Sequence, residues 1–116
     1  MNTEHPITRD ALLSVLSHHI GRDNGVTVTA LTRQVLGHEP TRGDERIVRK
    51  LVLELRLEGH HVCATTDGGY YIAANADELN ETIAFLRKRA MTSLEQIAAM
   101  KHVSLPDLFG QMHLPT

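Results

Sequence analysis

The chain has 116 residues, a formal net charge of −2, 41% hydrophobic residues and 22% charged residues. This length and composition indicate one globular domain with an appended element, and they argue against wholesale disorder. The near-neutral charge argues against a histone-like protein, because such proteins bind nucleic acid by neutralising many phosphates with Lys and Arg. A DNA-binding surface, if the chain has one, must therefore be local.

Two short helices are predicted in the first third of the chain. Thr8 is a suitable N-cap for the first, which places leucines on one face and is expected to stop at Gly21. The β-branched run 26–28 is compatible either with a short strand or with the beginning of the second helix. That second helix is expected to end at Leu36, before a glycine.

A third, longer helix is predicted after the Thr41-Arg42-Gly43-Asp44 segment, which is an acidic variant of the capping box. Val48, Leu51 and Leu55 share the face that is expected to pack on the first two helices. The opposite face carries cations on its early turns and two leucines on its late turns: Arg42, Arg46, Arg49, Lys50, Leu53 and Leu57. Early positive charge suits a helix that enters a DNA groove, whereas the leucines require cover from the next helix or from a second subunit.

A β-hairpin is predicted next, with strands at 62–65 and 70–73 joined by Thr66-Asp67-Gly68-Gly69. A long helix follows over 75–101, with apolar residues at steps of three and four: Leu79, Ile83, Leu86, Ala90, Leu94 and Ile97. About 25 residues at ~1.5 Å each make this helix longer than a small domain is wide. Its apolar stripe therefore predicts a homodimer.

The tail over 102–116 is predicted to be extended and partly apolar. Its segment 104–109, Ser-Leu-Pro-Asp-Leu-Phe, is similar to the Leu-x-Asp-Leu-Phe peptides that bacterial replication proteins insert into the sliding clamp. This similarity implies a replication-protein partner. The alternative is that Leu108 and Phe109 fold back on the chain's own dimer.

The segment VRKLVLELRLEGHHVCATTDGGYYIA, residues 48–73, resembles the closing half of biotin-repressor-type winged-helix domains. Together with RAMTSLEQIAAMK and LPDLFGQ, the chain looks like small winged-helix proteins of phages and prophages. The resemblance implies an α+β winged helix-turn-helix domain over residues 8–74, followed by a long C-terminal helix.

What the resemblance implies for function is a DNA-binding transcriptional regulator or replication accessory. With the homodimer that the 75–101 stripe predicts, the expected partner is double-stranded DNA bound by two copies. Carried over by position, Arg42, Arg46, Arg49 and Lys50 would contact phosphates or base edges. The hairpin turn contains Asp67 and no base, which does not favour minor-groove contact. The competing hypothesis is a protein-interaction adaptor that uses Leu53, Leu57 and the tail.

Catalysis, metal binding and cofactors are not expected. Adjacent histidines, as at 18–19 and 60–61, diverge on a helix and face opposite sides of a strand, so neither pair converges on one ion. Cys63 is the only cysteine, which excludes an internal disulfide and suits a reducing compartment. With no membrane span and no signal-peptide pattern over 1–7, the expected location is cytoplasmic.

Overall fold

The computed structural model describes residues 6–67 and 69–113, and within these ranges the chain is α+β. The elements are α1 (Arg9–Leu16), the short 3-10 helix η1 (Arg22–Asn24), β1 (Val26–Thr27), α2 (Val28–Leu36), α3 (Arg42–Leu57), β2 (Val62–Ala64), β3 (Gly69–Ile72), α4 (Ala76–Lys101) and α5 (Leu105–Gln111). The chain divides into two compact units, residues 1–82 and 83–116, which we call unit 1 and unit 2. The boundary falls inside α4.

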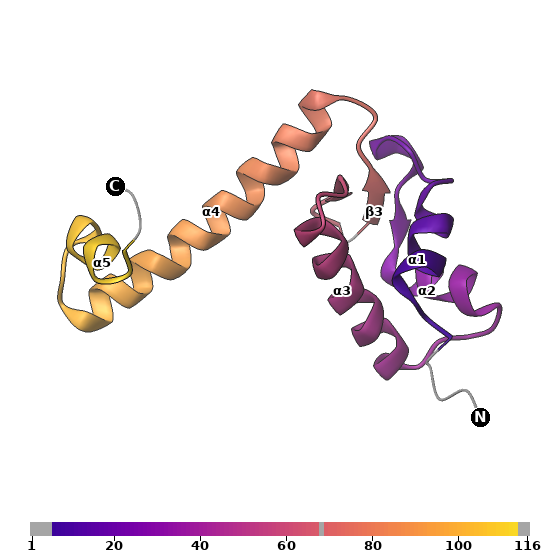
Figure 1. The fold of residues 1–116 in the computed structure, drawn as a ribbon, viewed down its shortest axis with the longest axis horizontal. Helices are drawn as coiled ribbons and strands as arrows, with labels where there is room; N and C mark the ends of the chain where they lie inside the picture. Colours follow the sequence, from indigo (N-terminus) through magenta and orange to yellow (C-terminus); the bar gives the residue numbers. More distant parts are fainter. Residues whose placement is uncertain (1–5, 68, 114–116) are drawn as a thin grey trace. The chain divides into compact units, whose positions relative to one another are not determined.

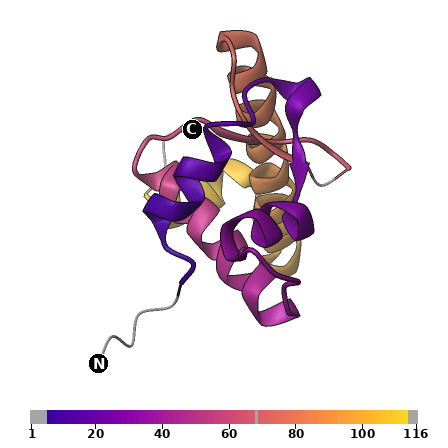
Figure 2. The same cartoon turned by 90° about the vertical axis from the view of Figure 1, so that its right-hand side faces the viewer.

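The core of unit 1 lies where α1, α2 and α3 pack on one another, as Figures 1 and 2 show. Its buried side chains are aliphatic: Ile7, Leu12, Leu16, Val26, Leu31, Val48, Val52, Leu55 and Val62. The buried residues of α3, Val48, Val52 and Leu55, are separated by four and three positions. They lie on one face because an α-helix has about 3.6 residues per turn. The predicted inward face of α3 is therefore confirmed at Val48 and Leu55, and Leu51 is partly buried.

Side-chain caps begin each of the first three helices. Thr8 accepts a hydrogen bond from Ala11 N at 3.1 Å, and Thr27 accepts one from Ala30 N at 3.1 Å. At α3 the predicted capping box is complete, since Thr41 and Asp44 each bind the other's backbone N–H. Gly37 ends α2 with φ of 80° in the left-handed region, as expected for a residue without Cβ.

The end of α1 corrects the sequence prediction. The helix ends at Leu16 rather than at Gly21, and the chain from there turns to run beside β3. Ile72 N donates to His19 O at 2.8 Å, and Gly21 N donates to Ile72 O at 2.8 Å. These tertiary hydrogen bonds replace the helical ones that the last turn would have made.

The small sheet is antiparallel in the order β1-β3-β2. The run 26–28 divides between the two alternatives, because Val26 and Thr27 pair with β3 while Val28 begins α2. The hairpin is present as predicted, with Val62 opposite Ile72 and Ala64 opposite Tyr70. Gly68, which belongs to the predicted turn, lies outside the described residues.

The beginning of α4 is fixed to unit 1 by Glu78. Its carboxylate accepts hydrogen bonds from Ala74 N at 2.8 Å and from Arg22 N at 3.0 Å. The side chain of Asn75, the residue before α4, accepts a hydrogen bond from Glu78 N at 3.0 Å. The bonds from Ala74 N and Arg22 N favour the ionised carboxylate and lower the pKa of Glu78.

We expect Glu78→Gln to lower the stability of unit 1 at neutral pH and to matter less in acid. A lowered folded-state pKa means that the ionised group stabilises the fold above its unfolded pKa, near 4.5. This contribution is lost as the pH falls through the folded-state pKa. Chemical denaturation at neutral pH and at about pH 3 checks it. Glu95→Gln, an exposed change in unit 2, serves as the control; equal losses for Glu78→Gln at both pH values would contradict the prediction.

Unit 2 contains the rest of α4 and α5, and Figure 1 shows α5 folded back beside the end of α4. Ser104 caps α5 by accepting from Asp107 N at 3.2 Å, and Pro106 stands in the first turn, where its missing N–H has no helical partner to lose. Leu108 is buried. The predicted extended tail is therefore wrong for 105–111, which is helical, and its last residues, 114–116, lie outside the described ranges.

Candidate nucleic-acid interface

The four cations predicted as DNA contacts are all exposed on one side of α3, and we call Arg42, Arg46, Arg49 and Lys50 the α3 basic face. Among the described residues, Arg49 alone of the four has an ion-pair partner, Glu45, at a long 3.8 Å. The two residues are one helical turn apart, at positions i and i+4. The other three positive charges are directed to solvent without a carboxylate.

The two acids of the first turn, Asp44 and Glu45, are also bound by groups outside the basic face. Asp44 accepts from Thr41 N at 2.9 Å as part of the cap. Glu45 accepts a hydrogen bond from the Thr29 hydroxyl on α2 at 3.3 Å, and its side chain is 19% exposed. The outward surface of the early turns of α3 is therefore positive, although the first turn also contains two acids.

The other three arginines of α1, η1 and α2 are paired with glutamates in unit 1. Arg9 binds Glu58, and Arg22 binds Glu81. Arg33 binds Glu39 through two hydrogen bonds of 2.6 and 3.2 Å, which raise the pKa of Arg33 and lower the pKa of Glu39. Unneutralised positive charge in the described part of unit 1 is thus concentrated on α3.

Helix stability does not account for this concentration. The N-terminal end of a helix carries a partial positive charge, so cations there are unfavourable by a few tenths of a kcal/mol each. Arg42, the first residue of α3, stands at this unfavourable position, whereas Arg46 lies beyond the first turn, where the effect has fallen off. A ligand that carries negative charge would compensate for this arrangement.

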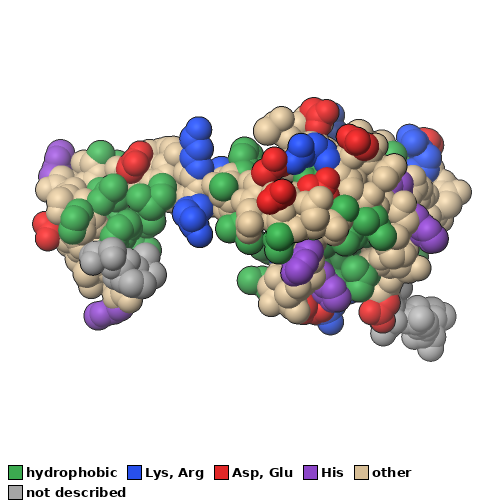
Figure 3. All heavy atoms as spheres, turned by 90° about the horizontal axis from the view of Figure 1, so that it is seen from above, with side chains coloured by type: hydrophobic (Ala, Val, Ile, Leu, Met, Phe, Trp, Pro, Cys, Tyr) green, Lys and Arg blue, Asp and Glu red, His purple; other side chains and the backbone are tan. Residues whose placement is uncertain are grey.

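Carboxylates of α4 do not neutralise the basic face within unit 1. Glu78 accepts from the backbone of Arg22, and Glu81 forms an ion pair with the Arg22 side chain. Both acids are therefore engaged at η1. In Figure 3, side chains of Asp and Glu (red) lie next to side chains of Lys and Arg (blue) in several places on the displayed face, as expected where cations outside α3 are paired.

The late turns of α3 expose the two leucines that were predicted to need cover. Leu53 is 55% exposed and Leu57 is 79% exposed, on the same side of the helix as the basic face. Arg56 is turned away from them and donates to Val62 O at 2.8 Å. An apolar surface thus continues the basic face toward the C-terminal end of α3.

The hairpin turn offers no positive charge. Thr65 binds the Asp67 carboxylate through its hydroxyl and also accepts from Gly69 N at 2.9 Å. A small hollow of about 140 Å³ beside the turn is lined by Arg22, Thr27 and Asp67, among others. Its Arg22 is already paired with Glu81, so the hollow adds no free cation.

The predicted interface stripe of α4 is mostly exposed. Leu79 and Leu94 are partly buried, whereas Ala90 is exposed and Ile83, Leu86 and Ile97 are about 40% exposed. In the tail, Leu108 is buried and Phe109 is partly buried in unit 2. A clamp-binding peptide of the kind predicted would be extended, with Leu108 and Phe109 free to enter a groove. Residues 105–111 are instead helical, so this arrangement is not present there.

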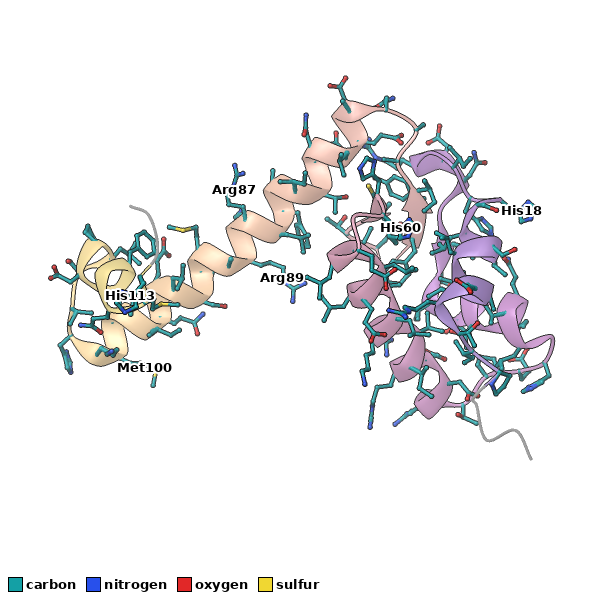
Figure 4. The ribbon with its side chains drawn as sticks, viewed as in Figure 1. His18, His60, Arg87, Arg89, Met100 and His113 are labelled. Atoms are coloured by element: carbon teal, nitrogen blue, oxygen red, sulfur yellow. The ribbon has the colours of Figure 1, made fainter. Side chains whose placement is uncertain are left out.

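Arg87, Lys88 and Arg89 are three consecutive exposed cations that were not among the predicted site residues. The guanidinium carbon of Arg89 lies 5.9 Å from the centre of the Phe85 ring. Consecutive helix positions are about 100° apart, and Figure 4 shows Arg87 and Arg89 on opposite sides of α4. The run Arg-Lys-Arg was visible in the sequence, but its members do not converge on one ligand.

No cluster of three or more His, Cys, Asp or Glu suitable for a metal ion occurs within residues 6–67 and 69–113. Cys63 is fully buried. The ring nitrogens of His19 lie 2.9 Å from Asn24 O and 2.8 Å from the Gln34 side-chain oxygen, so both are engaged in structural contacts.

The helices of the described ranges include none with the length and low charge required to cross a bilayer. Comparisons with protein-family models, curated proteins and solved structures gave no match to this chain.

Proposed function

We propose that unit 1 is a winged helix-turn-helix domain that binds double-stranded DNA through α3. The order of elements supports this: a helix, a short strand, two helices, and a hairpin whose second strand lies at the centre of the sheet. A helix followed by a two-stranded hairpin is how a winged helix-turn-helix domain ends, and α3, β2 and β3 follow one another in this way. The five residues 37–41 form the turn between α2 and α3, and the Arg33–Glu39 pair ties that turn to α2.

The observation that carries the proposal is the positive charge of the α3 basic face, three of whose four cations have no ion-pair partner among the described residues. In this proposal α3 lies in the major groove, which is wide enough for one helix. Arg42, Arg46 and Arg49 would reach phosphates or the acceptor edge of guanine, and Lys50 would contact a phosphate. A protein of this kind would act as a transcriptional regulator or as a replication accessory, with no reaction of its own.

A second candidate function is a protein-interaction adaptor, and the exposed Leu53 and Leu57 favour it. Two large apolar side chains one turn apart are a typical anchor for a helix or a groove of a partner. An adaptor gives no reason for the unpaired cations on the preceding turns. DNA binding accounts for those cations, and it is therefore the function that we put first.

The test compares two double variants in a titration with labelled duplexes of about 20 base pairs at roughly 50 and 200 mM salt. We expect Arg42→Ala/Arg46→Ala, which removes two exposed arginines without an ion-pair partner among the described residues, to weaken binding by about tenfold or more, because each lost contact is worth on the order of 1 kcal/mol. Arg9→Ala/Arg33→Ala removes the same charge from arginines that are already paired, and we expect it to bind nearly as wild type.

Absence of binding at the lower salt concentration would contradict the proposed function, as would equal losses in the two double variants. In the adaptor alternative neither variant affects DNA, and a partner protein is lost on Leu53→Asp/Leu57→Asp instead. Circular dichroism on each variant separates loss of binding from loss of folding.

A further inference from the structure

Unit 2 buries very little apolar surface of its own. Among its described residues, only Ala98 and Leu108 are buried hydrophobics. Six large hydrophobic side chains of the same unit are exposed: Ile83, Phe85, Leu86, Ile97, Met100 and Met112. A piece of about 30 residues normally needs a disulfide, a metal or another chain to complete its core. The described residues of unit 2 contain no cysteine and no metal cluster.

One row of exposed, mostly apolar side chains runs along α4. Counting from Ile83, steps of three and four residues alternate without interruption along the helix, and they define what we call the α4 seam: Ile83, Leu86, Ala90, Ser93, Ile97 and Met100. Alternating steps of three and four give a mean period of about 3.5, the spacing with which two α-helices keep one face in contact. Ala98, which is buried in unit 2, lies about 100° around the helix from Ile97.

We propose that the α4 seam pairs with the α4 seam of a second copy of this chain. The pattern of side-chain size is symmetric about the middle of the row, with two large residues, two small ones and two large ones. A second copy therefore matches it in either helix direction. The small Ala90 and Ser93 are exposed at the centre, where they let the two backbones approach closely.

The charges beside the seam are compatible with self-pairing. Arg87 and Arg89 flank it on opposite sides. If the two helices run parallel and in register, Arg89 of one copy lies opposite Leu94 of the second copy. If they run antiparallel with Ile83 opposite Met100, Arg89 lies opposite Gln96 of the second copy. No cation then opposes a cation, and the long Arg side chains cover the edges of the apolar row. Met100, which is 81% exposed and extends outward from α4, gains cover at the end of the row.

Sedimentation equilibrium of the full chain without DNA tests this pairing. We expect a dimer for the wild type, and a dissociation constant at least about a hundredfold higher for Leu86→Lys/Ile97→Lys, because buried interface anchors are worth more than tenfold each. Thr92→Lys/Glu95→Lys adds two lysines to the opposite, exposed side of the same helix and is expected to leave the dimer intact. A monomeric wild type at high protein concentration overturns the proposal, as does equal weakening by the two variants.

A cysteine cross-link keeps the proposal testable if the lysine variant does not fold. Ala90→Cys/Ser93→Cys places thiols at the centre of the α4 seam, where a second copy brings them together in either direction. Mild oxidation is expected to give a covalent dimer in high yield, and Thr92→Cys/Glu95→Cys to give little. Equal cross-linking of both overturns the pairing. Because neither measurement contains DNA, their outcome is independent of the proposed function of unit 1.

Discussion

A chain in which all four residues of the α3 basic face are replaced by alanine is expected to lose on the order of a thousandfold in affinity for duplex DNA. The estimate takes about 1 kcal/mol for each contact. Three of these side chains have no ion-pair partner among the described residues, so their removal breaks no salt bridge within the fold. The variant should therefore remain folded while its binding disappears.

The same variant should change how binding depends on salt. Each phosphate contact contributes about 0.9 to the slope of log affinity against log salt concentration, because a bound cation releases condensed counterions. If all four residues contact phosphates, the slope becomes shallower by roughly three to four. If one of the arginines reads a base edge instead, affinity falls by the same order but the slope changes less.

The matched control replaces the three arginines that are paired outside α3, Arg9, Arg22 and Arg33. This change removes nearly as much charge from the same unit but takes it from neutralised pairs. We expect a salt slope close to that of the wild type. A parallel loss in both variants would mean that the protein responds to net charge alone, and α3 would then have no special role.

The parts of the fold that could be predicted from the sequence are those fixed by neighbouring residues. The capping box of α3 needs only Thr41 and Asp44, which are three residues apart and bind each other's backbone. Gly37 ends α2 for an equally local reason, since its positive φ suits a residue without Cβ. The inward face of α3 follows from helical period alone.

At the end of α1, distant residues decide the local structure. The chain leaves α1 at Leu16 because the following residues hydrogen bond to Ile72 of β3, more than fifty positions later. The helix α5, by contrast, has a local signal: Ser104 and Asp107 form a cap, and Pro106 is compatible with a first helical turn. The prediction of an extended segment there is wrong for a local reason.

The composition of the α3 basic face could be predicted, whereas its electrostatic state could not. Periodicity places Arg42 and Arg46 on one side of a helix, and both are exposed. Whether an arginine is neutralised depends on partners such as Glu81, which lies 59 positions from Arg22 but pairs with it. The contrast between paired and unpaired arginines, on which the proposed function depends, required the fold.

Replacing Leu55 by alanine is expected to lower the free energy of unfolding of unit 1 by about 3 kcal/mol, the usual cost of deleting a fully buried leucine side chain. Leu55 is 1% exposed and belongs to the core between the helices. Leu57→Ala makes the same chemical change two residues later, at a side chain that is 79% exposed. We expect that variant to change unfolding by less than about 0.5 kcal/mol.

This pair of variants tests which side of α3 faces the core, and with it the orientation of the basic face. Residues 55 and 57 lie about 200° apart on the helix, so they cannot both point inward. Urea unfolding at low protein concentration, followed by circular dichroism, measures both. If Leu57→Ala costs as much as Leu55→Ala, Leu57 is covered, and Arg46, which lies near it around the helix, would not face solvent either. A large loss for Leu55→Ala alone leaves α3 with one outward side, carrying the unpaired cations on its early turns and the exposed leucines on its late turns.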